Sequence, residues 1–375
     1  MNAPLRPADW VLDLNEPIAA LGGSPDGRLI ATLGTEGSAW VVEASTGRRI
    51  HTFQAHEGGG FRLVWGPSGT SFATAGQDGQ VRLWDALTGT QTESLAMPSA
   101  WVEQLTVSPA GDRLAAASGK TVCIGRPGGS GWTHTLGGHC STVAGLAWSA
   151  DGRSLALGCY GGVTVYDADT GRVTAELPWK TSLVSVAISP DGRWVVAGTQ
   201  ENSVQIWPQP FREGEELAMS GYEAKVRSLA WHHSGRYLAT DGGQEPMVWD
   251  CSGKGPAGST PRILEGHPTR VSCLSYQKAG HLLASGCLGG RVLFWNAGKS
   301  SQPLRATVLS SAVTVLGWLP GDAWVMAGCR DGRLALISAP RSERAGGPWS
   351  LRLDRHPIAV LRPKPKNSRR RGCSG

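Results

Sequence analysis

The chain has 375 residues, of which 40% are hydrophobic and 18% charged, and it carries a formal net charge of +6. It offers neither the run of about 18 apolar residues of a membrane helix nor an apolar secretory segment near its start. This excludes a membrane-spanning protein and predicts a cytoplasmic one. The 52 glycines and 23 prolines favour many short strands joined by turns.

The first predicted elements lie near the N-terminus. Residues 1–9 are rich in proline and are expected to be flexible. Residues 10–14, WVLDL, have the character of a short strand and precede Pro17, much as residues 50–53 precede the first strand of the next unit. We therefore predict that residues 10–14 form the outer strand of a sheet whose other three strands lie elsewhere in the chain.

Residues 56–85, HEGGGFRLVWGPSGTSFATAGQDGQVRLWD, form a unit that the rest of the chain repeats with variations. Alternating apolar residues, with Gly and Pro between the runs, predict short strands joined by tight turns. The strands are expected at 61–65, 71–76, 81–84 and 90–95. A four-stranded sheet of this size cannot bury both of its apolar faces alone, so it must stack against its copies.

Two markers recur along the chain at nearly constant intervals. The glycine of the first hairpin turn recurs every 40 to 45 residues, and the end of the third strand every 41 to 46 residues. Such a period, with four strands per unit, points to propeller blades. The turn glycines are Gly27, Gly69, Gly111, Gly152, Gly192, Gly235, Gly280 and Gly321, and the third strands end at Val42, Trp84, Gly125, Tyr166, Trp207, Trp249, Trp295 and Ile337.

The residues at these positions resemble the WD40-repeat β-propeller family. Two units keep the dipeptide that names the family, as Trp84-Asp85 and Trp249-Asp250. In that family a His, a Ser or Thr, an Asp and the Trp of one unit form a hydrogen-bonded tetrad. The resemblance implies that one unit of this chain has the whole tetrad, namely His56, Thr74, Asp78 and Trp84.

Other units match the tetrad only in part. The unit with His267, Ser285 and Trp295 has Gly289 in place of the Asp. The unit with His139 lacks both the hydroxyl and the Trp. We therefore expect packing and strand-to-strand hydrogen bonds to hold most units together.

Eight repeats predict eight four-stranded blades, with seven blades as the alternative. A seven-bladed ring would need one unit to leave the array, and the third unit, which ends near Gly125, departs most from the pattern. A ring must close without an open sheet edge, because exposed edges invite aggregation. We favour closure by residues 10–14 beside 334–337, while residues 349–353 compete for the same edge.

The predicted propeller domain spans residues 10–354, and a basic tail follows at 355–375. From residue 341 onward there are ten basic and two acidic residues, so this segment carries +8 and residues 1–340 carry −2. The tail lacks an apolar period and is expected to be disordered. A weak contact with nucleic acid or an acidic partner would use Lys364, Lys366, Arg369, Arg370 and Arg371.

Two classes of function remain open. The resemblance implies a non-catalytic scaffold that binds protein or peptide partners. The alternative is an enzyme or ligand-binding propeller with a site in the central channel, but on the innermost strands only Arg62, Glu103 and Arg227 are charged, at unrelated positions. We favour the scaffold and predict no catalytic residues, metal site or cofactor. His232-His233 is interpreted as an exposed pair in a hairpin turn.

The candidate partner site lies at the mouth of the predicted channel. In each unit the residue just before the innermost strand lies there, on the face that members of the family commonly use for partners. Most of these residues are small, but three are not, and two large aromatics lie in the same class of loop. Trp, Tyr and Arg are enriched at binding hot spots. The candidate residues are Trp101, Trp179, Tyr222, Lys225 and Arg270.

Overall fold

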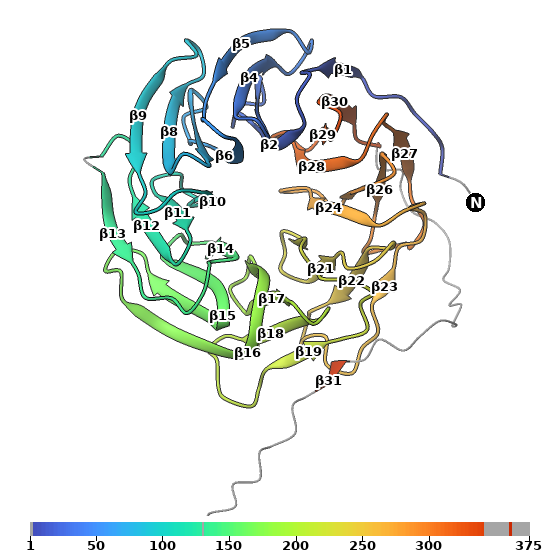
Figure 1. Ribbon diagram of the computed structural model, residues 1–375. Helices are drawn as coiled ribbons and strands as arrows, with labels where there is room; N and C mark the ends of the chain where they lie inside the picture. Colours follow the sequence, from blue (N-terminus) through green and yellow to red (C-terminus); the bar gives the residue numbers. More distant parts are fainter. Residues whose placement is uncertain (1–2, 130, 341–359, 362–375) are drawn as a thin grey trace, which may run out of the picture.

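The structure is a computed structural model that describes residues 3–129, 131–340 and 360–361. Its strands form antiparallel sheets that stand like blades around a common centre (Figure 1). The second repeat shows the pattern, with its innermost strand first along the chain. Its strands are β6 (Gly60–Trp65), β7 (Ser71–Gly76), β8 (Gln80–Asp85) and β9 (Gln91–Ala96).

Four other repeats form four-stranded sheets of the same kind. The first repeat contributes β2 (Ile18–Gly23), β3 (Leu29–Gly34), β4 (Ser38–Glu43) and β5 (Arg49–Gln54). The third contributes β10 (Val102–Val107), β11 (Leu114–Ser118), β12 (Thr121–Gly125) and β13 (Trp132–Leu136). The sixth contributes β20 (Leu229–Trp231), β21 (Tyr237–Thr240), β22 (Met247–Asp250) and β23 (Arg262–Ile263). The seventh contributes β24 (Val271–Tyr276), β25 (Leu283–Cys287), β26 (Arg291–Trp295) and β27 (Arg305–Val308).

The prediction of eight separate four-stranded blades is wrong. Counted as hydrogen-bonded sheets, the described strands form seven blades, of which six have four strands and one has seven. The fourth and fifth repeats share the seven-stranded sheet, whereas the third repeat, which we expected to be the first to leave the array, keeps a sheet of its own. The strands of the shared sheet are β14 (Gly145–Trp148), β15 (Ser154–Asp167), β16 (Val173–Ile188), β17 (Trp194–Thr199), β18 (Val204–Pro208), β19 (Leu217–Met219) and β31 (Val360–Leu361).

The two repeats merge because the connection between them is short and stays extended. β16 is at once the outer strand of the fourth repeat, where Val163 pairs with Leu177, and the inner strand of the fifth, where Val186 pairs with Ala197. In between, Ser182 pairs with Tyr160. No loop therefore separates the two repeats, which the regular spacing of the sequence markers does not reveal.

An N-terminal strand completes the last sheet. β1 (Trp10–Asp13) pairs with β30 (Arg333–Ser338), which continues to β29 (Trp324–Cys329) and β28 (Val313–Trp318). The Thr314 hydroxyl also donates a hydrogen bond to the carbonyl of Ile18 in the first repeat, at 2.7 Å. These pairings confirm the predicted closure by the N-terminal strand (Figure 1). The competing residues 349–353 lie outside the described residues.

The core lies between neighbouring repeats. One buried cluster, for example, packs Leu33 and Val41 of the first repeat against Trp65, Phe72 and Trp84 of the second. Each sheet thus buries its two faces against its neighbours, which is how repeats that are unstable alone become stable together. No helix in the described part of the chain is long and apolar enough to cross a membrane.

Candidate functional site

The four predicted tetrad residues form one hydrogen-bonded chain in the second repeat. His56 Nε2 lies 2.8 Å from Thr74 Oγ1, and His56 Nδ1 lies 2.9 Å from Asp78 Oδ1. Trp84 Nε1 donates to Thr74 Oγ1 at 2.9 Å. The loop before β6, strand β7, the turn after it and strand β8 each contribute one side chain. The tetrad therefore ties the three inner strands of this repeat together.

Charge at the tetrad is balanced by a neighbouring cation. Arg82 Nη1 lies 2.5 Å from Asp78 Oδ2 and also donates to the carbonyl of Ala55 at 2.8 Å. Burial by itself would raise the pKa of Asp78, but hydrogen bonds from Arg82 and His56 outweigh it and lower the pKa. Burial lowers the pKa of His56 despite the opposing effect of Asp78. A neutral imidazole beside an ionised carboxylate suits a structural network.

The seventh repeat has the incomplete tetrad expected from the sequence. His267 Nε2 lies 2.7 Å from Ser285 Oγ, and Trp295 Nε1 donates to the same oxygen at 2.7 Å. With Gly289 in the place of the Asp, the buried Nδ1 of His267 has no partner among the described residues. Burial, and then the charge of Arg291, lowers the pKa of His267 to about 3. This imidazole stays neutral at physiological pH.

Tyr222 does not belong to the partner site. Its side chain is 5% exposed, and its hydroxyl accepts a hydrogen bond from Trp249 Nε1 at 2.9 Å and lies 3.0 Å from Thr240 Oγ1. Tyr222 stands 18 residues before Thr240, the same spacing that separates His56 from Thr74. Tyr222 thus replaces the His of the tetrad in the sixth repeat, and its prediction as a binding residue is wrong.

Trp179 is also explained by packing. It is half-buried and packs against the core cluster of the fourth and fifth repeats. Its indole nitrogen is buried, and the Lys180 ammonium lies 5.8 Å from the ring centroid. The ring therefore offers a partner little free surface.

Lys225 and Arg270 lie together, as the sequence predicted for adjacent units. Arg270 is exposed, Lys225 is partly exposed, and Arg270 Nη2 lies 3.5 Å from the Lys225 carbonyl oxygen. Neither side chain forms an ion pair with a described residue. Below them, Asp241 is buried and accepts hydrogen bonds from the backbone N–H groups of Arg227 and Ser228 at 2.8 and 3.0 Å. Burial raises the pKa of Asp241 to about 6, although Arg270 opposes the shift.

Trp101 directly precedes the innermost strand β10, and β10 lies across the ring centre from β24 (Figure 1). It is 55% exposed and has a φ of 65°, which is rare for a residue other than glycine. Its backbone N–H bonds to the Gln77 carbonyl, and its ring contacts Phe61 with centroids 6.1 Å apart. The backbone therefore holds a large aromatic side chain in solvent.

Sequence reasoning missed two further exposed apolar residues at this mouth. Leu288 is 44% exposed and donates its backbone N–H to the Arg270 carbonyl. Tyr160 is 51% exposed and is anchored through its backbone N–H to Ser141. Leu288 lies in the turn between β25 and β26, and Tyr160 takes the equivalent place inside the continuous strand β15. Their place after the Gly-Cys that ends the second strand of the repeat was the signal that could have identified them, because in other repeats the backbone N–H at this place bonds to the residue just before the innermost strand, as in Leu288 to Arg270.

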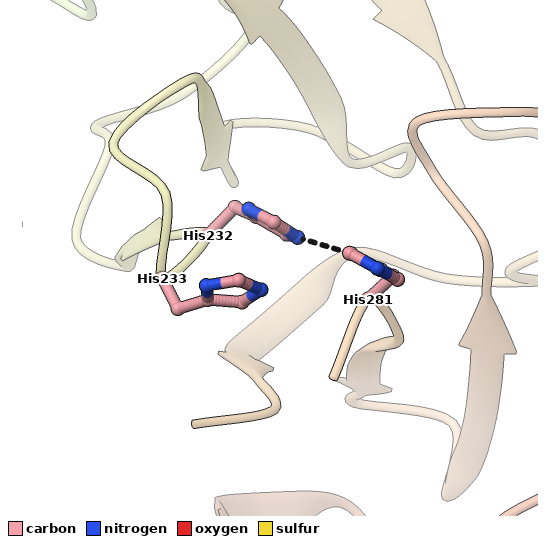
Figure 2. A group of neighbouring side chains, drawn as sticks. All are labelled: His232, His233 and His281. Atoms are coloured by element: carbon pink, nitrogen blue, oxygen red, sulfur yellow. Dashed lines mark hydrogen bonds between the residues drawn. The ribbon is translucent and has the colours of Figure 1, made fainter. Parts of the chain in front are cut away.

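A third missed feature is a group of three histidines on other turns. His232, His233 and His281 offer ring nitrogens that all lie within 4.8 Å of one another (Figure 2). His232 is buried, which corrects its interpretation as one of an exposed pair, whereas His233 and His281 are exposed. Burial, and then the charges of the other two imidazoles, lowers the pKa of His232 to about 4.

The predicted polyanion contacts lie outside the described residues. These are Lys364, Lys366, Arg369, Arg370 and Arg371. Within the tail, residues 360–361 are described and form β31 beside β19, with Leu361 paired to Ala218. Contact with nucleic acid or an acidic partner through the tail stays a prediction.

A family model described as WD domain, G-beta repeat, matches about half of the chain. The matched segments are 47–85, 131–167, 171–208, 215–250 and 258–296. The chain belongs to the WD40 family. This confirms the resemblance read from the tetrad and the Trp-Asp pairs.

Curated relatives are similar over part of their length. Actin-interacting protein 1 of Caenorhabditis elegans is 27% identical over 204 residues, which cover 53% of this chain and 33% of that protein. "Cell division cycle 20.1, cofactor of APC complex" of Arabidopsis thaliana is 30% identical over 177 residues, or 44% of this chain and 37% of that protein. The ribosome biogenesis protein WDR12 homolog of Drosophila sechellia is 24% identical over 142 residues, or 35% and 33%. The matches thus span about a third of the length of these relatives.

One solved structure shows the same fold. The crystal structure of the computationally designed Ika8 protein superposes with a TM-score of 0.74 at 19% identity. The match covers 90% of this chain and 100% of that one. At this identity the likeness establishes the architecture alone.

Proposed function

We propose that this protein is a non-catalytic interaction scaffold that binds an acidic protein or peptide segment at the channel mouth. The binding surface comprises Lys225, Arg270 and Leu288 on one side of the ring centre and Trp101 on the other. Membership of the WD40 family supports a scaffold role. The names of two relatives, an actin-interacting protein and a cofactor of the APC complex, describe proteins that work with protein partners.

The contact between Lys225 and Arg270 carries the proposal. The two residues come from adjacent sheets, and the hydrogen bond from Arg270 to the Lys225 carbonyl places the Arg270 guanidinium beside the Lys225 backbone. Residues 1–340 carry a net charge of −2, so a local pair of cations without an ion-pair partner among the described residues stands out from its surroundings. Such a pair would steer and orient a carboxylate-bearing segment.

The apolar residues of the mouth would supply affinity. Leu288 adjoins Arg270, and Trp101 holds its ring in solvent across the ring centre. Exposed apolar side chains rimmed by charge are typical of protein interaction sites. We infer a partner segment that places an aromatic or aliphatic side chain on one side and acidic side chains on the other.

The test compares two double charge reversals in affinity purification from native lysate with mass spectrometry. Lys225→Glu with Arg270→Glu should lose at least one partner that the wild type retains. The control, Lys254→Glu with Arg172→Glu, reverses two exposed cations in turns away from the mouth and should retain it. Both variants should keep the wild-type melting temperature. If the mouth variant retains every partner, the proposed site is wrong.

A second variant separates the apolar contribution from the charge. Trp101→Ala should weaken binding of the same partner, because it removes contact area. The factor by which the affinity falls should change little with salt concentration. The charge reversal should matter most at low ionic strength. If Trp101→Ala has no effect on any partner, the surface does not extend across the ring centre.

A further inference from the structure

Three imidazoles meet where the sixth and seventh repeats adjoin. His232 and His233 lie in the turn between β20 and β21, and His281 lies in the turn between β24 and β25 (Figure 2). His232 Nε2 lies 2.9 Å from His281 Nδ1, and these two rings are stacked with centroids 5.1 Å apart. The His233 ring centroid lies 4.2 Å from that of His232 and 5.5 Å from that of His281. The three side chains thus form one compact cluster on two neighbouring sheets.

Two departures from the repeat pattern create this cluster. In every repeat, a backbone N–H at the start of the first hairpin turn bonds to the carbonyl of the residue five positions later. This shared hydrogen bond shows which residues occupy equivalent positions in different repeats. His232 takes the place that a serine holds in four other repeats, and His281 the place that an arginine holds in four others. The serines are Ser24, Ser108, Ser149 and Ser189, and the arginines are Arg28, Arg153, Arg193 and Arg236.

First-hairpin turns of neighbouring repeats adjoin at several boundaries of the ring. A Cβ built on Gly235 would lie 2.5 Å from Asp191 of the preceding repeat, and one on Gly111 would lie 2.5 Å from Pro67. At these boundaries the turn of one repeat is packed closely against the turn of the preceding one. At the boundary between the sixth and seventh repeats, this packing brings the imidazoles of His232 and His281 together.

The turns that carry the histidines are firmly held. Asp322 of the next repeat accepts hydrogen bonds from the backbone N–H groups of Lys278, Ala279 and Gly280, at 2.7 to 3.0 Å, and so fixes the turn before His281. The ring of His232 packs edge-on against Tyr237, with centroids 5.9 Å apart. Ordering the ligands in advance lowers the entropic cost of binding a metal ion.

We propose that His232, His233 and His281 form a zinc site that joins the sixth and seventh repeats. Imidazole is a preferred ligand of Zn²⁺, and three histidines that leave a fourth position open are an established zinc coordination set. His232 Nδ1 lies 2.8 Å from Ser234 Oγ and accepts a longer hydrogen bond, at 3.2 Å, from the Ser234 backbone N–H. When a metal ion binds Nε2, the ring proton has to lie on Nδ1, where it can be donated to Ser234 Oγ in a hydrogen bond, as outer partners of metal-binding histidines accept it.

Metal binding needs only a small adjustment of the cluster. Zn–N bonds of about 2.0–2.1 Å at tetrahedral angles place the nitrogens about 3.3 Å apart. The present separation of His232 Nε2 and His281 Nδ1 is 2.9 Å, and all three ligand atoms lie within 4.8 Å. The exposed rings of His233 and His281 can rotate into place. The nearby Arg236 is paired with Asp250 at 2.8 Å, so its charge is compensated.

The position of the site gives it two consequences. The bound ion would add a link between two sheets that already meet through side-chain packing and hydrogen bonds, such as that from Leu274 N–H to Ser228 Oγ, so it should stabilise the ring. The fourth position would face solvent beside two exposed imidazoles, where water or a ligand from another molecule completes the coordination. Carboxylate, imidazole and thiolate groups are suitable ligands.

The test uses tag-free, full-length protein and zinc chloride as the probe. Isothermal titration should show one equivalent bound, and the melting temperature should rise with zinc, because the ion binds the folded state. Cobalt should give the intense visible absorption of a tetrahedral site. His233→Gln with His281→Gln changes two exposed side chains, so it should fold normally, and it should lose at least tenfold in zinc affinity together with the thermal shift.

The control variant removes the same number of histidines as the test variant, but away from the cluster. His51→Gln with His134→Gln removes two histidines of outer strands, each of which contacts a backbone carbonyl in the next repeat, and should bind zinc as the wild type does. Zinc binding that is unchanged in His233→Gln with His281→Gln overturns the proposal. Binding that disappears only after alkylation of the thiols also overturns it, because the metal then sits on cysteines such as the exposed Cys140.

Discussion

Trp249 Nε1 donates a hydrogen bond to the hydroxyl of Tyr222 at 2.9 Å. The same hydroxyl lies 3.0 Å from Thr240 Oγ1, so one phenol joins the loop before β20 to strands β21 and β22. In the second repeat His56 reaches Thr74 from the equivalent position, and Trp84 donates to Thr74 itself. The sixth repeat thus keeps the network with a side chain that does not titrate near neutral pH.

Tyr222→Phe should lower the free energy of unfolding by about 1–3 kcal/mol, because it leaves the indole N–H of Trp249 buried without its acceptor. Chemical denaturation measures the change. Tyr160→Phe is the matched control, since that hydroxyl belongs to a side chain that is 51% exposed, and it should stay within about 0.5 kcal/mol of the wild type. Equal midpoints for the two variants would contradict the structural role of Tyr222.

The complete tetrad of the second repeat should also contribute to stability. Asp78→Ala removes the partner of His56 Nδ1 and of Arg82, and should cost about 1–3 kcal/mol. Trp84→Ala also removes a large buried ring from between two repeats, and should cost about 3–5 kcal/mol. Thermal and urea unfolding measure both. An unchanged midpoint for Asp78→Ala would show that the network does not stabilise this repeat.

Asp241 should make stability depend on pH. Its pKa is raised to about 6, whereas an unperturbed Asp titrates near 3.8, so between these values the folded state binds more protons than the unfolded state. Its contribution to stability is present below about pH 3.8 and is lost as the pH rises to about 6. At about 1.4 kcal/mol per pKa unit, the loss is about 1–3 kcal/mol.

Asp241→Asn removes this loss. An Asn side-chain oxygen can still accept the hydrogen bonds from the backbone N–H groups of Arg227 and Ser228. The variant should therefore be more stable than the wild type at pH 7.5 and differ less from it at pH 4. Denaturation series at several pH values test this. A variant that is less stable than the wild type at pH 7.5 would show that the charge of Asp241 is needed, most directly by Arg270.

Closure of the ring should depend on one face of β1. Trp10 is partly buried and donates its indole N–H to the Ala44 carbonyl at 2.9 Å, whereas its neighbour Val11 is 51% exposed. Trp10→Ala should lower the melting temperature by several degrees, because the last sheet loses one of its hydrogen bonds to the first repeat and part of its packing there. Val11→Ala should leave the temperature within error. The same loss in both variants would mean that strand pairing, and not the Trp10 contact, holds the closure.

The sequence by itself was sufficient for most of the architecture. The period of 40 to 45 residues, the turn glycines and the strand character of residues 10–14 predicted the strands, the family and the closing strand, because these features reflect local turn chemistry and the face that each side chain presents. The tetrad of His56, Thr74, Asp78 and Trp84 could also be placed, since its spacing along the chain follows from the strand lengths.

The tertiary structure decided how neighbouring repeats meet. The fourth and fifth repeats merged into one sheet because residues 178–182 stay extended, which the turn markers on either side do not report. Tyr222 proved to be buried because the hydroxyl of Thr240 lies within its reach, while Trp101 remained exposed through a left-handed backbone. His232 and His281 stand 49 residues apart, and only the packing of adjacent turns brings their nitrogens to 2.9 Å. A repeating sequence specifies each unit through local chemistry, but contacts between units depend on packing across the interface, where each position has a different partner.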